Sequence, residues 1–342
     1  MSSFGTGSTG HWQIPMTGLS SHWCALPASR SCCGRCGPTT STTPRTRPGL
    51  RSWPSLMRCI PARALRLGSV NPIAFAKGHG TGNDFVVLPD LDGIVDLSAA
   101  TVRALCDRRT GIGADGVLRI VREGSTFFMD YRNADGSFAQ MCGNGIRVFA
   151  RYLVDHDLAA PGLMTIDTRG GAHEVRCPVE GDIEVAMGVP TLPNARAMPV
   201  VTIGERSWSA APVLIPNPHA VVIVDDLEDA GDLSDAPEVT PAAVFPDGVN
   251  VEFVRPVADE HITMRVFERG VGETRSCGTG ACAAAFAARR QHGQPMPGTM
   301  RVDVPGGTVH VRESDDGHLV LIGTAVIVAQ GHLNQEWWEA HA

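Results

Sequence analysis

The chain of 342 residues contains a single lysine, Lys77, and only two tyrosines. Enzymes that use pyridoxal phosphate hold it as a lysine Schiff base. That cofactor could therefore be held only at Lys77, in a segment without the companion residues that such a site needs. The His, Cys and acidic residues show no spacing typical of a metal site. No stretch of about 18 apolar residues occurs, so a membrane-spanning helix is not expected.

Acidic residues are missing from residues 1–71, which hold eight arginines and no Asp, Glu or Lys. The remainder carries 21 basic against 36 acidic residues, and an acidic body argues against nucleic acid as a partner. Because this segment is rich in Ser, Thr, Pro and Arg without an apolar period, we expect it to be disordered. It fits either a transit peptide or upstream sequence translated from a misplaced start codon. We favour the second, with Val70 or Met57 as the true start.

Five of the ten cysteines lie in that N-terminal segment. Cys33-Gly-Arg-Cys36 matches the C-x-x-C pattern of thioredoxins, but no βαβ pattern surrounds it, so no redox role is assigned. Cys106, Cys177 and Cys282 are expected to be buried and inert. The irregular spacing indicates neither a disulfide framework nor a zinc site, and a reducing cytoplasm is the expected location.

An internal repeat is the most informative pattern in the chain. Residues 129–153 match residues 264–288 without gaps, and Cys142 falls on Cys277. Each copy reads as a strand, a polar turn, Cys-Gly-x-Gly and an apolar helix. This repeat is much longer than a solenoid period of about 20–50 residues. It predicts two copies of one domain of about 120–130 residues, a size that can hold its own core.

Short, β-rich segments dominate both copies and are separated by Gly, Pro and Asp. The helices expected over 146–153 and 281–288 are apolar on nearly every side, which predicts that they are buried. Ser98 is expected to cap a further helix over 99–109. The fold class is therefore α+β, with two pseudo-twofold related domains, each a curled β-sheet around a central helix. The expected strands are 84–89, 116–121, 127–133, 164–168, 174–179, 183–187, 220–224, 250–254, 262–267, 300–304, 308–311 and 320–328.

The chemistry follows from a cysteine placed directly before each buried helix. A helix N-terminus carries about half a positive charge, which is expected to lower the thiol pKa from about 8.5. The glycines let backbone N–H groups approach an anion, so Gly143-Asn144 and Gly278-Thr279 read as two carboxylate cradles. One thiolate could remove the proton beside a carboxylate while the other thiol protonates the opposite face, without a cofactor.

Other polar residues are open to two interpretations. Residues 78–84 superficially suggest a phosphate loop, but they lack Lys-Ser/Thr and precede a strand, so nucleotide binding is not expected. Glu268 and Arg269 could form a surface pair, although the repeat places them beside the site. Asn83 is a plausible polar site residue. Three further asparagines at strand ends or turns are either turn-formers or site residues: Asn133, Asn217 and Asn250.

Taken together, these motifs resemble the diaminopimelate epimerase family, in family order across residues 73–330. The matching segments are 75–85, 111–115, 133–137, 142–145, 217–219, 248–250, 268–270 and 272–280.

This resemblance implies interconversion of LL- and meso-diaminopimelate without pyridoxal phosphate or metal, in lysine and peptidoglycan precursor synthesis. It implies Cys142 and Cys277 as the acid/base pair and a site between the two halves. It also implies that the C-terminal strand 325–330 belongs to the first domain, so the expected domains are 72–188 with 325–330, and 189–324. A homodimer is left open.

The resemblance also assigns substrate contacts. Arg269 suits a carboxylate and Glu268 an ammonium, and His219 flanks the site. Gly116 departs from many relatives, which carry Gln there. The remaining expected contacts are Asn83, Asn133, Gly143, Asn144, Asn217, Asn250, Gly278 and Thr279.

Three alternatives remain. Proline racemase-like and hydroxyproline epimerase-like enzymes also use two cysteines, but their substrates have no distal amino-acid end for Glu268 and Arg269 to bind. A non-catalytic binding protein on this fold should lack one or both thiols. A thiol–disulfide oxidoreductase would need Cys33 and Cys36 on a folded domain.

Overall fold

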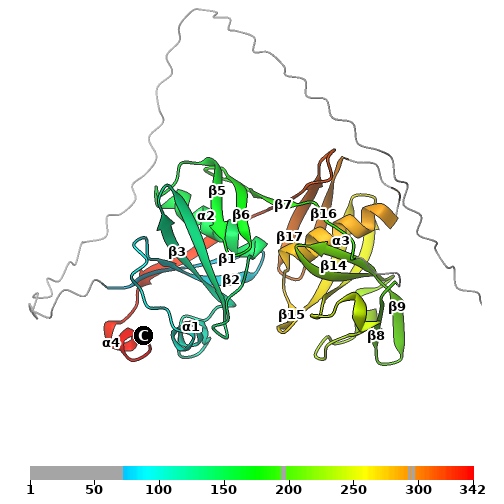
Figure 1. Ribbon diagram of the computed structural model, residues 1–342, viewed down its shortest axis with the longest axis horizontal. Coiled ribbons are helices and arrows are strands. Elements are labelled where there is room, and N and C mark those ends of the chain that lie inside the picture. The colour runs from blue at the N-terminus through cyan, green and yellow to red at the C-terminus, as the bar shows by residue number, and fades with distance from the viewer. Residues whose placement is uncertain (1–71, 194–197, 292, 294–296) are drawn as a thin grey trace, which may run out of the picture. The chain divides into compact units, whose positions relative to one another are not determined.

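The computed structural model describes residues 72–193, 198–291, 293 and 297–342 (Figure 1). Residues 71–342 cluster as one compact unit. The expectations for residues 1–71, including Cys33 and Cys36, lie outside the described part of the chain.

The first half contains seven strands around the helix α2 (Gly143–Asp155). β2 pairs with β3 in parallel, and β4 with β5, whereas the other neighbours are antiparallel. The strands are β1 (Ala74–Gly80), β2 (Asn83–Pro89), β3 (Gly116–Glu123), β4 (Thr126–Asn133), β5 (Gly162–Thr168), β6 (Gly171–Cys177) and β7 (Ile183–Gly188).

The second half repeats this topology around α3 (Gly278–Gln291). Its parallel pairs are β11 with β13 and β14 with β16, at the same places in the order. The register repeats too, because Phe85 faces Gly116 in the first half and His219 faces Asn250 in the second. The strands are β10 (Ala211–Ile215), β11 (Asn217–Ile223), β13 (Asn250–Ala258), β14 (His261–Glu268), β16 (Gly298–Val304), β17 (Gly307–Glu313) and β18 (Leu319–Gly323).

One sheet of 16 strands runs through both halves, because β18 pairs with β7. At one end of its order β19 (Val326–His332) pairs with β1, and β15 (Gly272–Thr274) adds to β14. A separate three-stranded sheet orders β12 (Glu238–Thr240), β8 (Val200–Ile203) and β9 (Arg206–Ser209). Two single 3₁₀ turns, Leu227–Ala230 and Ala242–Val244, lie in the second half.

The two central helices carry the core of their halves. Residues 143–154 of α2 and residues 278–289 of α3 are buried, and each helix packs on strands of its own half. In the strands, alternate side chains point inward, as Ile262, Met264 and Val266 do in β14. The expected α+β class, with a sheet curled around each helix, is confirmed (Figure 1).

Two sequence-based expectations were wrong in detail. The helix capped by Ser98, α1 (Ala99–Cys106), ends three residues early, because the Asp107 carboxylate accepts the backbone N–H groups of Arg109 and Thr110 and turns the chain. The expected strand 320–328 is two strands, β18 and β19. β18 pairs with β7, whereas β19 pairs with β1, so the chain leaves one partner strand before it joins the other. The short helix α4 (Gln335–Glu339) ends the fold.

Candidate active site

Cys142 caps the N-terminus of α2. Its backbone is extended, and its sulfur accepts the N–H of Gly145 at 3.4 Å. The thiol lies 3.6 Å from Oδ1 of Asn83, to which it donates. Asn83 comes from the start of β2, so the first thiol is held between a helix end and a strand end.

Cys277 stands in the equivalent place before α3. Its sulfur accepts the N–H of Gly280 at 3.4 Å and lies 3.4 Å from Oγ1 of Thr279. The residue is almost fully buried, whereas Cys142 is partly exposed. Both cysteines are free thiols.

The N-termini of the two helices meet at Gly143 and Gly278. A Cβ atom built on Gly278 would lie 3.2 Å from Cα of Gly143, and one on either glycine would lie 2.9 Å from Cδ2 of Leu321. A side chain at either position would press on Leu321 and on the facing helix end, so glycine suits this close approach. Nδ2 of Asn144 donates to the carbonyl of Ser276 at 2.9 Å, which ties the two cysteine segments together. The structure thus brings both thiols and both expected carboxylate cradles to one place.

Arg147, one turn into α2, is fully buried beneath this meeting point. Its guanidinium donates to Oγ1 of Thr81 at 2.8 Å, Oδ1 of Asn144 at 3.1 Å, and the carbonyls of Gly143 and Thr324. No acidic residue in the described ranges forms an ion pair with it. Burial lowers its pKa to about 10. An uncompensated positive charge behind a carboxylate cradle favours an anion in that cradle.

The expected lowering of the thiol pKa values is wrong. Burial raises the pKa of Cys142 to about 11, and the hydrogen bond from Gly145 only partly offsets it. Burial also raises the pKa of Cys277, and the negative charges of Glu268 and Glu252 act in the same direction. Desolvation of a thiolate in this packed site therefore outweighs the field of the helix end.

Three side chains of the second half are linked in series by hydrogen bonds. Nδ1 of His219 lies 2.6 Å from Oε1 of Glu252, and both side chains are completely buried. Nε2 of His219 lies 3.0 Å from Oδ1 of Asn217. Sequence reasoning named His219 and Asn217 but missed Glu252, whose only signal was a lone acid in the apolar run 251–254.

Glu268 and Arg269 follow one another at the end of β14 but differ in environment. The Glu268 carboxylate accepts a hydrogen bond from Thr274 at 2.5 Å, and burial raises its pKa against the bonds from Thr274 and Cys277. The Arg269 backbone N–H donates to Oδ1 of Asn250 at 2.9 Å. Glu268 therefore lies beside Cys277, and Asn250 holds the backbone of the residue that follows Glu268.

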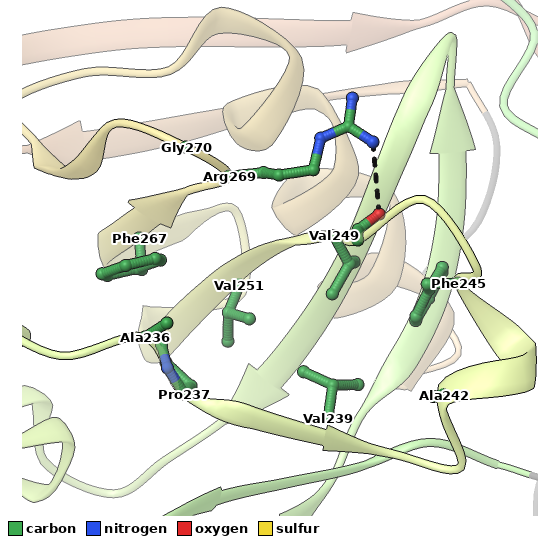
Figure 2. A pocket seen from close by; sticks show the side chains of 11 residues that line it. Ala236, Pro237, Val239, Ala242, Phe245, Val249, Val251, Phe267, Arg269 and Gly270 are labelled. Atoms are coloured by element: carbon green, nitrogen blue, oxygen red, sulfur yellow. Dashed lines mark hydrogen bonds between the residues drawn. The ribbon is translucent and has the colours of Figure 1, made fainter.

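The side chain of Arg269 is exposed and is among the residues that line a cavity of about 320 Å³ (Figure 2). Its guanidinium donates to the carbonyls of Asp247, at 2.5 Å, and Gly248, at 3.5 Å. Apolar side chains form most of the remaining wall, and neither cysteine is among the described residues that line it. The lining residues include Pro237, Val239, Phe245, Val249, Val251 and Phe267.

Two further expected contacts sit on the first half. Asn133 ends β4 and donates to Oγ of Ser137 at 3.0 Å, so its amide is engaged within its own turn. Asn83 is oriented from behind by Asp115, which accepts its Nδ2 at 2.7 Å. At Gly116 a Cβ atom would lie 2.5 Å from the carbonyl oxygen of Arg132, so this backbone admits no side chain at that position.

No group of three or more His, Cys, Asp or Glu side chains among the described residues could hold a metal ion. No helix in the same ranges is long and apolar enough to cross a membrane. Cys106 and Cys282 are buried, and burial raises the pKa of each to about 12.

Comparison with known protein families identifies the family to which the chain belongs. The family model described as "Diaminopimelate epimerase" matches residues 75–193 and 213–328. The chain belongs to the diaminopimelate epimerase family. Both matched segments contain one of the two cysteines and its helix.

Named relatives agree with this family assignment. A diaminopimelate epimerase of Streptomyces coelicolor is 50% identical over 283 residues, covering 78% of this chain and 97% of the relative. One from Mycolicibacterium smegmatis is 44% identical over 295 residues, covering 78% and 99%.

Solved structures outside the diaminopimelate epimerase family share the fold. A Bacillus anthracis phenazine biosynthesis protein of the PhzF family superposes with a TM-score of 0.57 at 15% identity, covering 78% of this chain and 100% of its own. A probable proline racemase from Agrobacterium radiobacter gives 0.56 at 16% identity, covering 77% and 93%. At such identities the likeness concerns the fold alone.

Proposed function

We propose that the protein interconverts LL- and meso-2,6-diaminopimelate, as the names of its relatives indicate, and so serves lysine and peptidoglycan precursor synthesis. The observation that carries the proposal is the meeting of two free thiols, each at a helix N-terminus, across the Gly143–Gly278 contact. This arrangement suits proton transfer on two opposite faces of one carbon beside a carboxylate.

In the proposed reaction one cysteine acts as thiolate and removes the α-proton. The electron pair left on carbon spreads into the α-carboxylate, which the N–H groups of Gly143, Asn144, Gly278 and Thr279 bind. The other cysteine, as thiol, delivers its proton to the opposite face. One C–H bond breaks and one forms, so the turnover inverts the centre and leaves the two thiols with exchanged protonation states.

The raised thiol pKa values bear on this mechanism. A thiol with a pKa of about 11 yields a strongly basic thiolate, and a strong base helps to remove a weakly acidic α-proton. The α-ammonium of an entering amino acid would bring a positive charge beside the sulfur, which favours ionisation. Arg147 adds a second positive charge behind the carboxylate.

The two ends of the substrate need different partners. We assign Glu268, Asn217, Asn250 and Arg269 of the second half to the ammonium and carboxylate groups, because together they supply one buried acid, one cation and two amides. Asn83 and Asn133 would contact the substrate from the first half. The domain limits, a homodimer and the cytoplasmic location remain predictions.

The direct test is inversion of LL-diaminopimelate in D₂O. Two bases predict that the meso product carries solvent deuterium at the inverted carbon, while recovered LL-substrate stays largely unlabelled at early times. Mass spectrometry of the separated isomers measures both. Return of the original proton to product would indicate a single shuttling base, and no conversion at all would refute the proposed substrate.

Arg269→Lys should lower kcat/KM by about 100-fold, because lysine cannot reproduce the bidentate pair of a guanidinium with a carboxylate. The circular dichroism spectrum should stay unchanged, since the side chain is exposed. Arg301→Lys is the matched control, because Arg301 is an exposed arginine on β16. Near-normal kinetics for Arg269→Lys would contradict its assignment to the distal carboxylate.

The runner-up, a proline racemase-like activity, is favoured only by the shared fold. It is distinguished by assaying L-proline and trans-4-hydroxy-L-proline beside diaminopimelate.

A further inference from the structure

The two thiol-bearing helices rest on different side chains, although their strands repeat in register. On β3 the position paired with Val87 is Leu118, and on β13 the equivalent position, paired with Val221, is Glu252. On β2 the position paired with Gly116 is Phe85, and on β11 its equivalent is His219. An apolar pair in the first half is therefore replaced by an ionisable pair in the second.

Each pair lies directly against the first turn of its helix. A Cβ atom built on Gly145 would lie 3.2 Å from Leu118 and 3.4 Å from Phe85. One built on Gly280 would lie 2.8 Å from Oε1 of Glu252. The N–H of Gly280 donates to the Cys277 sulfur, so the acid contacts the same helical turn that holds the second thiol.

Packing alone does not explain the acid. Glu252 and His219 are fully buried, and Oε2 of Glu252 accepts no hydrogen bond from any described residue. Burying a carboxylate is unfavourable unless it is paired, and Leu118 with Phe85 fills the same space in the first half without that penalty. The ionisable pair therefore has a role that the apolar pair lacks.

Three groups face this pair from the surrounding elements. Cys277 precedes α3, Glu268 ends β14, and Asn217 begins β11. Both ring nitrogens of His219 face oxygen atoms, of Glu252 and of Asn217. His219 thus links Glu252 to the side-chain amide of Asn217.

We propose that Glu252, acting through His219 and the first turn of α3, is a positioning residue that keeps the resting proton on Cys277 and leaves Cys142 as the thiol that ionises. The proposal rests on the proposed function in that the two cysteines are the acid/base pair. The two halves are then electrostatically distinct although their backbones repeat.

The charges around each sulfur support this assignment. Beyond burial, the carboxylates of Glu268 and Glu252 both raise the pKa of Cys277. For Cys142, Glu268 acts in the same direction, but Arg147 opposes it. A negative charge next to a thiol disfavours the thiolate, so the second thiol is the one that stays protonated.

The test measures the pH dependence of alkylation at each cysteine in the full-length, folded protein. Initial rates of iodoacetamide labelling are followed by peptide mass spectrometry, with fragment spectra to separate Cys277 from Cys282. In the unsubstituted protein, the midpoint for Cys142 should lie below that for Cys277. In Glu252→Gln, the Cys277 midpoint should fall by about one pH unit, a tenfold rise in its thiolate fraction below the midpoint. The Cys142 midpoint should not move.

Glu313→Gln is the matched control, because Glu313 is a buried carboxylate in the same half, paired with Arg290 at the far end of α3. It should move neither midpoint. An unmoved Cys277 midpoint in folded Glu252→Gln, or equal shifts at both cysteines, would overturn the proposal. If Glu252→Gln does not fold, the order in the unsubstituted protein decides, and Cys277 ionising first would overturn it. The assay uses no substrate, so its outcome is independent of whether diaminopimelate is the substrate.

Discussion

Cys142→Ala and Cys277→Ala should each lower kcat/KM for inversion by at least about 1000-fold, within the range that a general acid or base contributes. Each sulfur is fixed by its own helix end, through Gly145 or Gly280. One thiol therefore cannot serve both faces of the α-carbon. Chromatographic separation of the LL and meso isomers measures the loss.

The same variants should keep a partial reaction. Each should still exchange the α-proton of only that stereoisomer whose proton faces the remaining thiol, which NMR in D₂O detects. Cys106→Ala is the control, because it removes a buried thiol from the separate cluster around α1 and should retain activity. Inversion at close to the unsubstituted rate in either catalytic variant would refute the two-thiol mechanism.

Arg147→Lys should reduce the free energy of unfolding by about 1.5–3 kcal/mol, the range for hydrogen bonds made by a charged group. The site arranges four oxygen acceptors around a planar guanidinium, and an ammonium cannot reach them all. Arg147→Met should destabilise less, because it removes the buried charge together with the hydrogen bonds. Urea denaturation measures both changes.

Arg151→Lys gives the matched comparison on the same helix. Arg151 is nearly as buried but pairs with Asp155 four residues later, at 3.1 Å, so a lysine there keeps an acidic partner and should cost less stability. If Arg147→Lys proved as stable as the unsubstituted protein, or more stable than Arg147→Met, the guanidinium would not be the organising group beneath the helix ends.

Much of the fold was predictable because the sequence contains an internal repeat. The match of residues 129–153 with 264–288 gave the strand, turn, cysteine and helix of each half, and the helices begin directly after the cysteines as expected. Composition alone did not reveal the break between β18 and β19. The run is apolar on both sides of Thr324, and only the change of pairing partner interrupts it.

The motifs indicated which side chains meet at the helix ends better than they indicated the electrostatics there. Cys142, Cys277, Asn83 and Asn144 come together at the helix ends as the motifs indicated. The direction of the thiol pKa shifts was not predictable, because it depends on how completely the folded chain removes water from the sulfur. Glu252 was missed for a related reason: its position behind Cys277 follows from strand register, which a motif search does not read.

The pairing of β1 with β19 has a consequence for the order in which the chain is made. Ala74 lies opposite His332, and Oγ1 of Thr101 donates to the carbonyl of His341. The outer edge of β1 thus receives its hydrogen bonds from a strand that is synthesised only after the second half. Until then the first half has an unpaired edge strand, which is prone to pairing with other chains. The N-terminal half is therefore synthesised first, but its sheet is completed only after the second half has been made.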